Sequence, residues 1–133
     1  MGRTRTRTTA GIVLDAGALI AVDRGDKRMI ALLHRAITQG RVFRVPAGVV
    51  GQAWRDGRIQ ATLARFLRSK EVEIIALDEQ LARSCGELCG AADSSDIIDA
   101  SVVILARERR DPIVTSDPND LQRLDPAAQI IPV

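Results

Sequence analysis

Aromatic residues and long apolar runs are both scarce in this chain of 133 residues, which contains two Phe, one Trp and no Tyr. Apolar residues still make up 46%, so aliphatic side chains must fill the core. That composition suits helices packed on a buried parallel sheet, whose strands consist of continuous aliphatic runs. No apolar stretch approaches the ~18–20 residues that span a bilayer, and the run at 11–14 is too short for a secretory signal. We therefore expect a soluble, cytoplasmic protein of one domain, with no membrane association.

Histidine, cysteine and lysine are nearly absent as well. The only histidine is His34, so histidine-based catalysis has little support. Cys85 and Cys89 lie four residues apart in a helical pattern, which favours core packing over a zinc or disulfide site. The pattern G-x-x-x-x-G-K-[ST] is missing, which argues against a nucleoside triphosphatase. A phosphoacceptor domain would need an acidic pair beside the first strand and a late lysine, but the only lysines are Lys27 and Lys70.

Positive charge is concentrated at the start of the chain. The net charge is +2, and Arg3, Arg5 and Arg7 lie within the first ten residues. These residues show no apolar periodicity, so we predict a flexible basic arm at 1–10 and a single domain at 11–133. The arm either contacts nucleic-acid phosphates without sequence preference or is disordered like an expression tag.

Short aliphatic runs alternate with helical patterns through the rest of the chain. Asp26 and Asp78 are predicted helix N-caps. Pro46 suits the first turn of a helix that continues through Trp54, and Ile59 is predicted to lie on the apolar face of the next helix. The alternation is typical of an α/β three-layer sandwich with a mostly parallel sheet of four to five strands flanked by helices. The predicted strands are 12–14, 42–45, 72–75, 112–115 and a short run at 130–131.

Four aspartates occupy positions that point to chemistry. Asp15 follows the first strand and Asp117 follows the fourth, and parallel strands end at one edge of their sheet. Asp96 and Asp99 lie three apart at the start of a helix, and therefore on one face. If that helix begins at the same edge, four carboxylates converge. Two like charges ~5 Å apart repel by roughly 3 kcal/mol at an effective dielectric of ~20, so the cluster favours a bound cation. Oxygen-only ligands select Mg²⁺ or Mn²⁺, which can activate water for phosphodiester hydrolysis.

Structural alternatives remain open for some of these residues. An aspartate at a helix start is commonly only an N-cap, which is a sufficient role for Asp96. Asp120 has the same alternative in the turn that leads to Leu121. Asp15 and Asp99 are harder to explain in this way, because a buried carboxylate is costly unless it is paired.

Three acidic blocks resemble those of a known family. They are I-V-L-D-A-G-A-L-I-A at 12–21, D-I-I-D-A-S-V-V-I-L-A at 96–106 and I-V-T-S-D-P-N-D-L at 113–121. These blocks resemble PIN-domain ribonucleases, most closely the VapC-type toxins of bacterial toxin–antitoxin pairs. The resemblance implies a PIN-like fold and a Mg²⁺- or Mn²⁺-dependent endoribonuclease that acts on RNA. It also implies a homodimer and inhibition by a small VapB-type antitoxin.

The resemblance assigns roles to individual residues and shows one departure. Many relatives carry a Glu, with an Arg three residues on, in the helix after the second strand. Here that stretch reads V-V-G-Q-A-W-R, so Gln52 replaces the Glu while Arg55 remains. A neutral amide predicts weaker metal binding unless another carboxylate compensates, and it leaves open a degenerate PIN-like domain that only binds protein or RNA. The implied metal-binding and catalytic residues are Asp15, Asp99 and Asp117, with Asp96 and Asp120 nearby and Gln52 and Arg55 in support.

Overall fold

Five parallel strands form the centre of the molecule. The computed structural model describes residues 9–133, so most of the predicted basic arm, including Arg3, Arg5 and Arg7, lies outside the described residues. The strand order is β3-β2-β1-β4-β5, and every neighbouring pair is parallel. The predicted α/β class is therefore confirmed, with the fifth strand included. The strands are β1 (Gly11–Leu14), β2 (Val42–Pro46), β3 (Val72–Ile75), β4 (Ile113–Thr115) and β5 (Ile130–Pro132).

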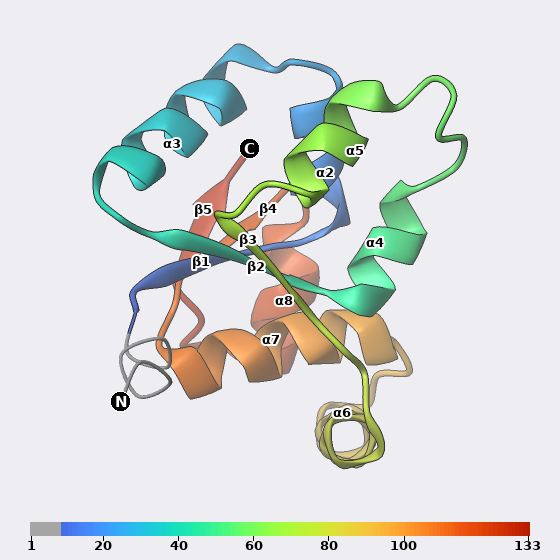
Figure 1. Cartoon of the computed structure of the whole chain (residues 1–133). Helices are drawn as coiled ribbons and strands as arrows, with labels where there is room; N and C mark the ends of the chain where they lie inside the picture. The colour runs from blue at the N-terminus through green and yellow to red at the C-terminus, as the bar shows by residue number, and fades with distance from the viewer. Residues whose placement is uncertain (1–8) are drawn as a thin grey trace, which may run out of the picture.

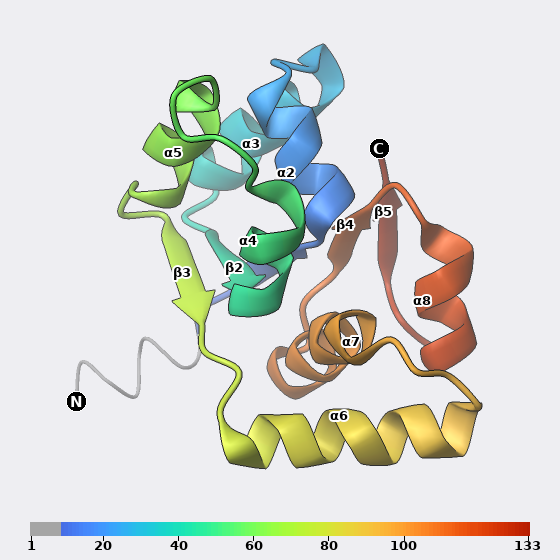
Figure 2. The same ribbon diagram turned by 90° about the vertical axis from the view of Figure 1, so that its right-hand side faces the viewer.

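Helices cover both faces of this sheet (Figures 1 and 2). One face carries α2 (Ala16–Asp23), α3 (Lys27–Thr38), α4 (Ala47–Ala53) and α5 (Ala61–Leu67). The other carries α7 (Ile97–Arg109), with α6 (Glu79–Ala92) packed outside it and α8 (Pro118–Leu124) beside it. The predicted three-layer arrangement is confirmed. Among residues 9–133, no helix has the length and apolar character needed to cross a membrane.

The position of α7 explains its apolar sequence. The helix lies between the sheet and α6, and its residues from Ala100 to Ala106 are all buried. A helix enclosed on two sides has no solvated face over that stretch, so it lacks the usual polar stripe. Cys85 and Cys89 of α6 are buried, as core packing predicts, and burial raises the pKa of the Cys85 thiol. The few aromatics contribute little, and Phe43 meets Phe66 with ring centroids 5.6 Å apart.

Two helices begin at the aspartates that were predicted to cap them. The Asp26 carboxylate accepts from the backbone N–H of Met29 at 2.9 Å, and that of Asp78 accepts from Leu81 at 2.8 Å. Both predicted N-caps are therefore confirmed.

The prediction around α4 needs correction. Pro46 is the last residue of β2 and precedes the helix, and Trp54 follows it with an extended backbone. Ile59 lies in the loop before α5 and is 78% exposed, so it is not on an apolar helix face. The cause is Gln60, whose amide oxygen accepts from the N–H groups of Arg55 and Asp56 and holds this stretch in a tight turn.

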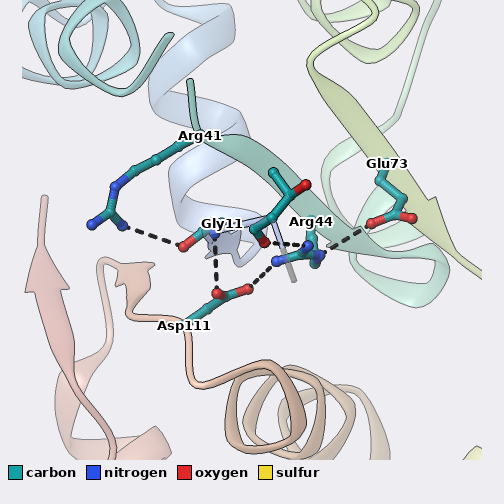
Figure 3. A network of polar contacts seen from close by, with 6 residues as sticks. Gly11, Arg41, Arg44, Glu73 and Asp111 are labelled. Carbon is teal, nitrogen blue, oxygen red and sulfur yellow. Dashed lines mark hydrogen bonds and ion pairs between the residues drawn. The ribbon is translucent and has the colours of Figure 1, made fainter. Parts of the chain in front are cut away.

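The amino edge of the sheet carries a buried charge network (Figure 3). Arg44 of β2 is only 1% exposed, and its Nη1 lies 2.6 Å from Oδ2 of Asp111. Its Nε donates to Glu73 at 3.1 Å and its Nη2 donates to the carbonyl of Thr9 at 2.8 Å. The second oxygen of Asp111 accepts from the N–H of Gly11 at 3.1 Å. A Cβ on Gly11 would lie 2.2 Å from Arg44 Nη1, so the glycine leaves room for the guanidinium.

Candidate active site

Asp15 lies where β1 ends and α2 begins. Its backbone N–H continues the pairing with β4 by donating to the carbonyl of Val114 at 3.2 Å. Its side chain is the N-cap of α2, because Oδ1 accepts from the N–H of Ala18 at 3.0 Å. The residue is 8% exposed. Burial raises the pKa of Asp15, and the negative charge of Asp117 adds to that effect, while hydrogen bonds from Thr115 and Ala18 oppose it. Asp15 therefore has a capping role that its sequence position did not reveal, beside its chemical one.

Thr115 connects the ends of β1 and β4. Its hydroxyl donates to Oδ2 of Asp15 and accepts from the N–H of Asp117 at 2.8 Å. It is completely buried, at 0% exposure. Sequence patterns did not single it out, although a hydroxyl that closes a buried aliphatic strand beside an Asp was the available signal. Thr115 therefore orients the Asp15 carboxylate and fixes the loop that carries Asp117.

A small residue lets this loop approach α2. A Cβ built on Gly17 would lie 2.0 Å from Oγ of Ser116, closer than real side chains come. The absence of a side chain at Gly17 therefore permits the loop before Asp117 to rest on the first turn of α2. Within the block at 12–21, the resemblance assigned only Asp15 to the site, and Gly17 allows the close approach of Ser116.

Asp96 and Asp99 lie at the start of α7. Asp96 is its N-cap, with Oδ1 accepting from the N–H of Asp99 at 2.9 Å. Asp99 is half-buried, and burial is the largest cause that raises its pKa, to about 7. The charges of Asp96, Asp120 and Asp15 raise it further. Asp99 thus interacts with carboxylates of α8 and of the β1–α2 junction, which places the start of α7 at the carboxyl edge of the sheet. The capping alternative for Asp96 is correct, and it coexists with this electrostatic contact.

A cavity of about 150 Å³ opens beside Asp99. Asp120, in the first turn of α8, contributes to its wall, and no side chain caps the start of that helix. The capping role considered for Asp120 is therefore not found. The residues around the cavity are Ala92, Ser94, Asp96, Asp99, Asp120, Arg123 and Leu124.

The candidate ligands have the right chemistry for a divalent cation, but their spacing does not form a complete site. Every candidate ligand is a carboxylate oxygen, the donor type that Mg²⁺ and Mn²⁺ prefer. None of the ion pairs within residues 9–133 includes Asp15, Asp96, Asp99, Asp117 or Asp120. In the same part of the chain, however, no three acidic, histidine or cysteine side chains lie close enough to bind one ion together. The carboxylates therefore lie at one edge without closing around a common point, and Asp15 and Asp96 each use one oxygen to cap a helix.

Gln52 and Arg55 differ in their relation to this edge. A Cβ on Gly48 of α4 would lie 3.0 Å from Ile98, so this face of α4 meets the first turn of α7. Gln52 is four residues further along the same face and is half-buried. The guanidinium of Arg55 instead donates to the carbonyls of Gly51 at 3.0 Å and Trp54 at 2.7 Å. Arg55 therefore provides hydrogen-bond donors for backbone carbonyls at the end of α4, and the structure shows no contact between it and the carboxylates.

Solved structures share this architecture. A chain of VapBC2 from Rickettsia felis, crystallised with a DNA fragment from its promoter, has a TM-score of 0.67 and 16% identity, covering 92% of this chain and 98% of that chain. VapC20 from Mycobacterium tuberculosis, described as a sarcin-ricin loop cleaving toxin, has a TM-score of 0.59 and 17% identity, covering 79% and 87%. FitAcB from Neisseria gonorrhoeae has a TM-score of 0.62 and 16% identity, covering 90% and 96%.

These identities are too low to carry more than the fold. No protein-family model and no curated protein sequence matches the chain. The likeness nevertheless extends over nearly the whole described domain, and the acidic edge falls on the three blocks that suggested the resemblance. The chain has the fold of the VapC-type PIN-domain toxins.

Proposed function

We propose that this protein is a metal-dependent endoribonuclease that acts as the toxin of a VapBC-type pair. One observation carries the proposal: carboxylates from separate chain segments gather at the carboxyl edge of the sheet, and no basic residue within 9–133 forms an ion pair with them. A strongly perturbed carboxyl in such a cluster marks a candidate functional site. The likeness to a toxin described as cleaving the sarcin-ricin loop supports RNA as the substrate.

Asp15, Asp99 and Asp117 would hold Mg²⁺ or Mn²⁺, with Asp96 in support. When bound, such an ion supplies positive charge to a phosphodiester and lowers the pKa of a water molecule. Thr115 contributes by orienting the Asp15 carboxylate and by fixing the N–H of Asp117. The carboxylates would have to be drawn together on binding, because no three of them within residues 9–133 lie close enough to hold one ion.

The similarity to solved structures also supports a proposal about the partners of this chain. The structures of VapBC2 and FitAB both contain a bound DNA fragment. We infer a small VapB-type antitoxin as the partner of this chain, a homodimer as its assembly, and the cytoplasm, where RNA is accessible, as its location. Partly exposed apolar side chains offer surface for such contacts; these are Ile20, Ile37, Ile59, Ile74 and Leu77.

Cleavage of a single-stranded RNA oligonucleotide by the purified protein tests the activity. Addition of Mg²⁺ or Mn²⁺ should start cleavage and EDTA should stop it. Asp99→Asn should lower kcat by about 10²–10³-fold, because Asp99 would hold the cation that stabilises negative charge in the transition state. Glu108→Gln is the matched control, because Glu108 is an exposed carboxylate at the far end of the same helix. Cleavage by Asp99→Asn at the wild-type rate would disprove the assignment.

The rival function is a PIN-like module that binds RNA or protein without cutting it. Gln52 favours this reading, since it places an uncharged amide where relatives carry a carboxylate. Binding of the same oligonucleotide by wild type, without cleavage in either metal, would establish this rival.

A further inference from the structure

One basic residue lies in the wall of the acidic cavity. Asp120 and Arg123 are three residues apart on α8, so they share one face of the helix, and both line the cavity beside Asp99. Arg123 is exposed. No other lysine or arginine is among the residues that line this cavity.

The guanidinium of Arg123 is also available for a new contact. Within residues 9–133, its side chain forms no hydrogen bond and no ion pair. The contrast with other arginines is clear, since Arg44 is tied to Asp111 and Arg107 is tied to Asp125. Arg55, the arginine that the resemblance assigned to the site, is occupied by two backbone carbonyls. Arg123 lines the same cavity as three carboxylates and pairs with none of them, so its guanidinium is available to an incoming anion.

An RNA strand that binds at the acidic cavity needs a positively charged side chain there. Each phosphate carries a negative charge, so a strand that approaches the acidic edge meets repulsion from Asp96, Asp99 and Asp120. Arginine presents its N–H groups in a planar fork that matches two phosphate oxygens. A phosphate held by Arg123 would place the adjoining linkage next to the carboxylates.

We propose that Arg123 binds a phosphate of the RNA backbone and thereby positions the strand at the acidic edge. This inference rests on the proposed ribonuclease function and adds a substrate contact to it. Arg123 is a substrate-binding residue, so its loss should weaken binding far more than it slows the chemical step.

The test uses the full chain and a 5′-fluorescein-labelled single-stranded RNA. Binding is measured by fluorescence anisotropy in EDTA across a series of salt concentrations, and cleavage is measured with Mn²⁺. Arg123→Ala should raise Kd and KM by about tenfold, as expected for the loss of one charge-assisted contact. The slope of log K against log salt should become shallower by about 0.7, the value for one phosphate contact on a single strand. Arg123→Lys keeps the charge and should retain the salt slope while losing part of the affinity.

Arg83→Ala is the matched control. Arg83 is exposed on α6, and within residues 9–133 its one ion pair is with Glu79. The substitution therefore removes the same charge away from the cavity. It should leave Kd, KM and the salt slope unchanged.

Each other outcome overturns the proposal. An unchanged KM and salt slope in Arg123→Ala, with an active wild type, would remove Arg123 from the substrate site and leave the nuclease intact. An equal loss in Arg83→Ala would mean that only overall charge matters. A fall in kcat without a change in KM would place Arg123 in support of the carboxylates. A wild type that neither binds nor cuts RNA would overturn this inference and the proposed function together.

Discussion

Opposite charges are paired at one edge of the sheet, whereas like charges lie near one another at the other edge. At the amino edge, Arg44 is almost fully buried, and its donors meet Asp111, Glu73 and a backbone carbonyl (Figure 3). At the carboxyl edge, Asp15 and Asp99 face other carboxylates, and both have raised pKa values. Buried side-chain polar atoms in residues 9–133 all have hydrogen-bond partners, so the carboxyl edge is not unsatisfied in hydrogen bonds. Within residues 9–133, however, none of its aspartates forms an ion pair.

This difference indicates that the network at the amino edge is structural and that the carboxylates at the carboxyl edge serve a function. A paired charge in a buried place holds chain segments together, here β2, the start of β1 and Asp111, which lies two residues before β4. Like charges held side by side oppose folding and persist only where something else uses them. Mutations at the two edges should therefore change stability in opposite directions.

The largest effect is expected at the amino edge. Arg44→Ala should lower the free energy of unfolding by about 3–5 kcal/mol, because it leaves Asp111 buried without its counter-charge. Urea unfolding followed by circular dichroism measures the loss. Glu73→Gln is the control at the same arginine, and it should cost at most about 1 kcal/mol because Glu73 is 39% exposed. A loss below about 1 kcal/mol for Arg44→Ala would show that the network does not hold this edge.

At the carboxyl edge the sign should reverse. Asp99→Asn should stabilise the metal-free protein at pH 8 by roughly 1–2 kcal/mol, after the shift in pKa is discounted for the solvent around a half-buried group. Unfolding in EDTA measures this gain, and Glu108→Gln should show none. Asp15→Asn should gain less, since it disturbs the bonds from Ala18 and Thr115. Destabilisation by Asp99→Asn would indicate that its carboxylate is already compensated.

The stability of the metal-free protein should depend on pH through the same group. The pKa of Asp99 is about 7 in the folded state and near 3.8 when unfolded, so the folded state binds the extra proton between these values. The free energy of unfolding should therefore fall as pH rises from about 4 to 7, and level off above. The difference between wild type and Asp99→Asn, measured from pH 5 to 8 in EDTA, isolates this contribution. Parallel curves would contradict the assignment, and added Mg²⁺ should flatten the wild-type curve.

The smallest effect is expected at Gln52. Gln52→Glu should cost at most about 1 kcal/mol in EDTA, since the half-buried residue lies on the face of α4 that meets α7. With Mn²⁺ the loss should reverse and metal affinity should rise, which titration calorimetry measures. Gln52→Met removes the amide without adding charge and serves as the control. A melting point unchanged by either metal or mutation would place Gln52 outside the site.

Prediction from sequence succeeded where the signal is local. Aliphatic runs predicted all five strands. The reason is clearest for β1 and β4, which are buried throughout, because a strand covered on both faces is mainly apolar. Asp26 and Asp78 were recognised as caps from their neighbours alone. The prediction was wrong for Ile59, because its place depends on the side chain of Gln60 folding back on the turn.

The sequence by itself determined the parallel α/β architecture and the aspartates that end β1 and β4, because both follow from the order of residues along single segments. Only the tertiary structure decided which groups meet. Thr115 reaches Asp15 across a sequence separation of 100 residues, and Arg44 reaches Asp111 across 67. The folded chain also turned Arg55 toward its own helix and brought Arg123 to the carboxylates. The physical reason is that charge pairing and desolvation depend on distance in space, and parallel strands bring remote segments to one edge.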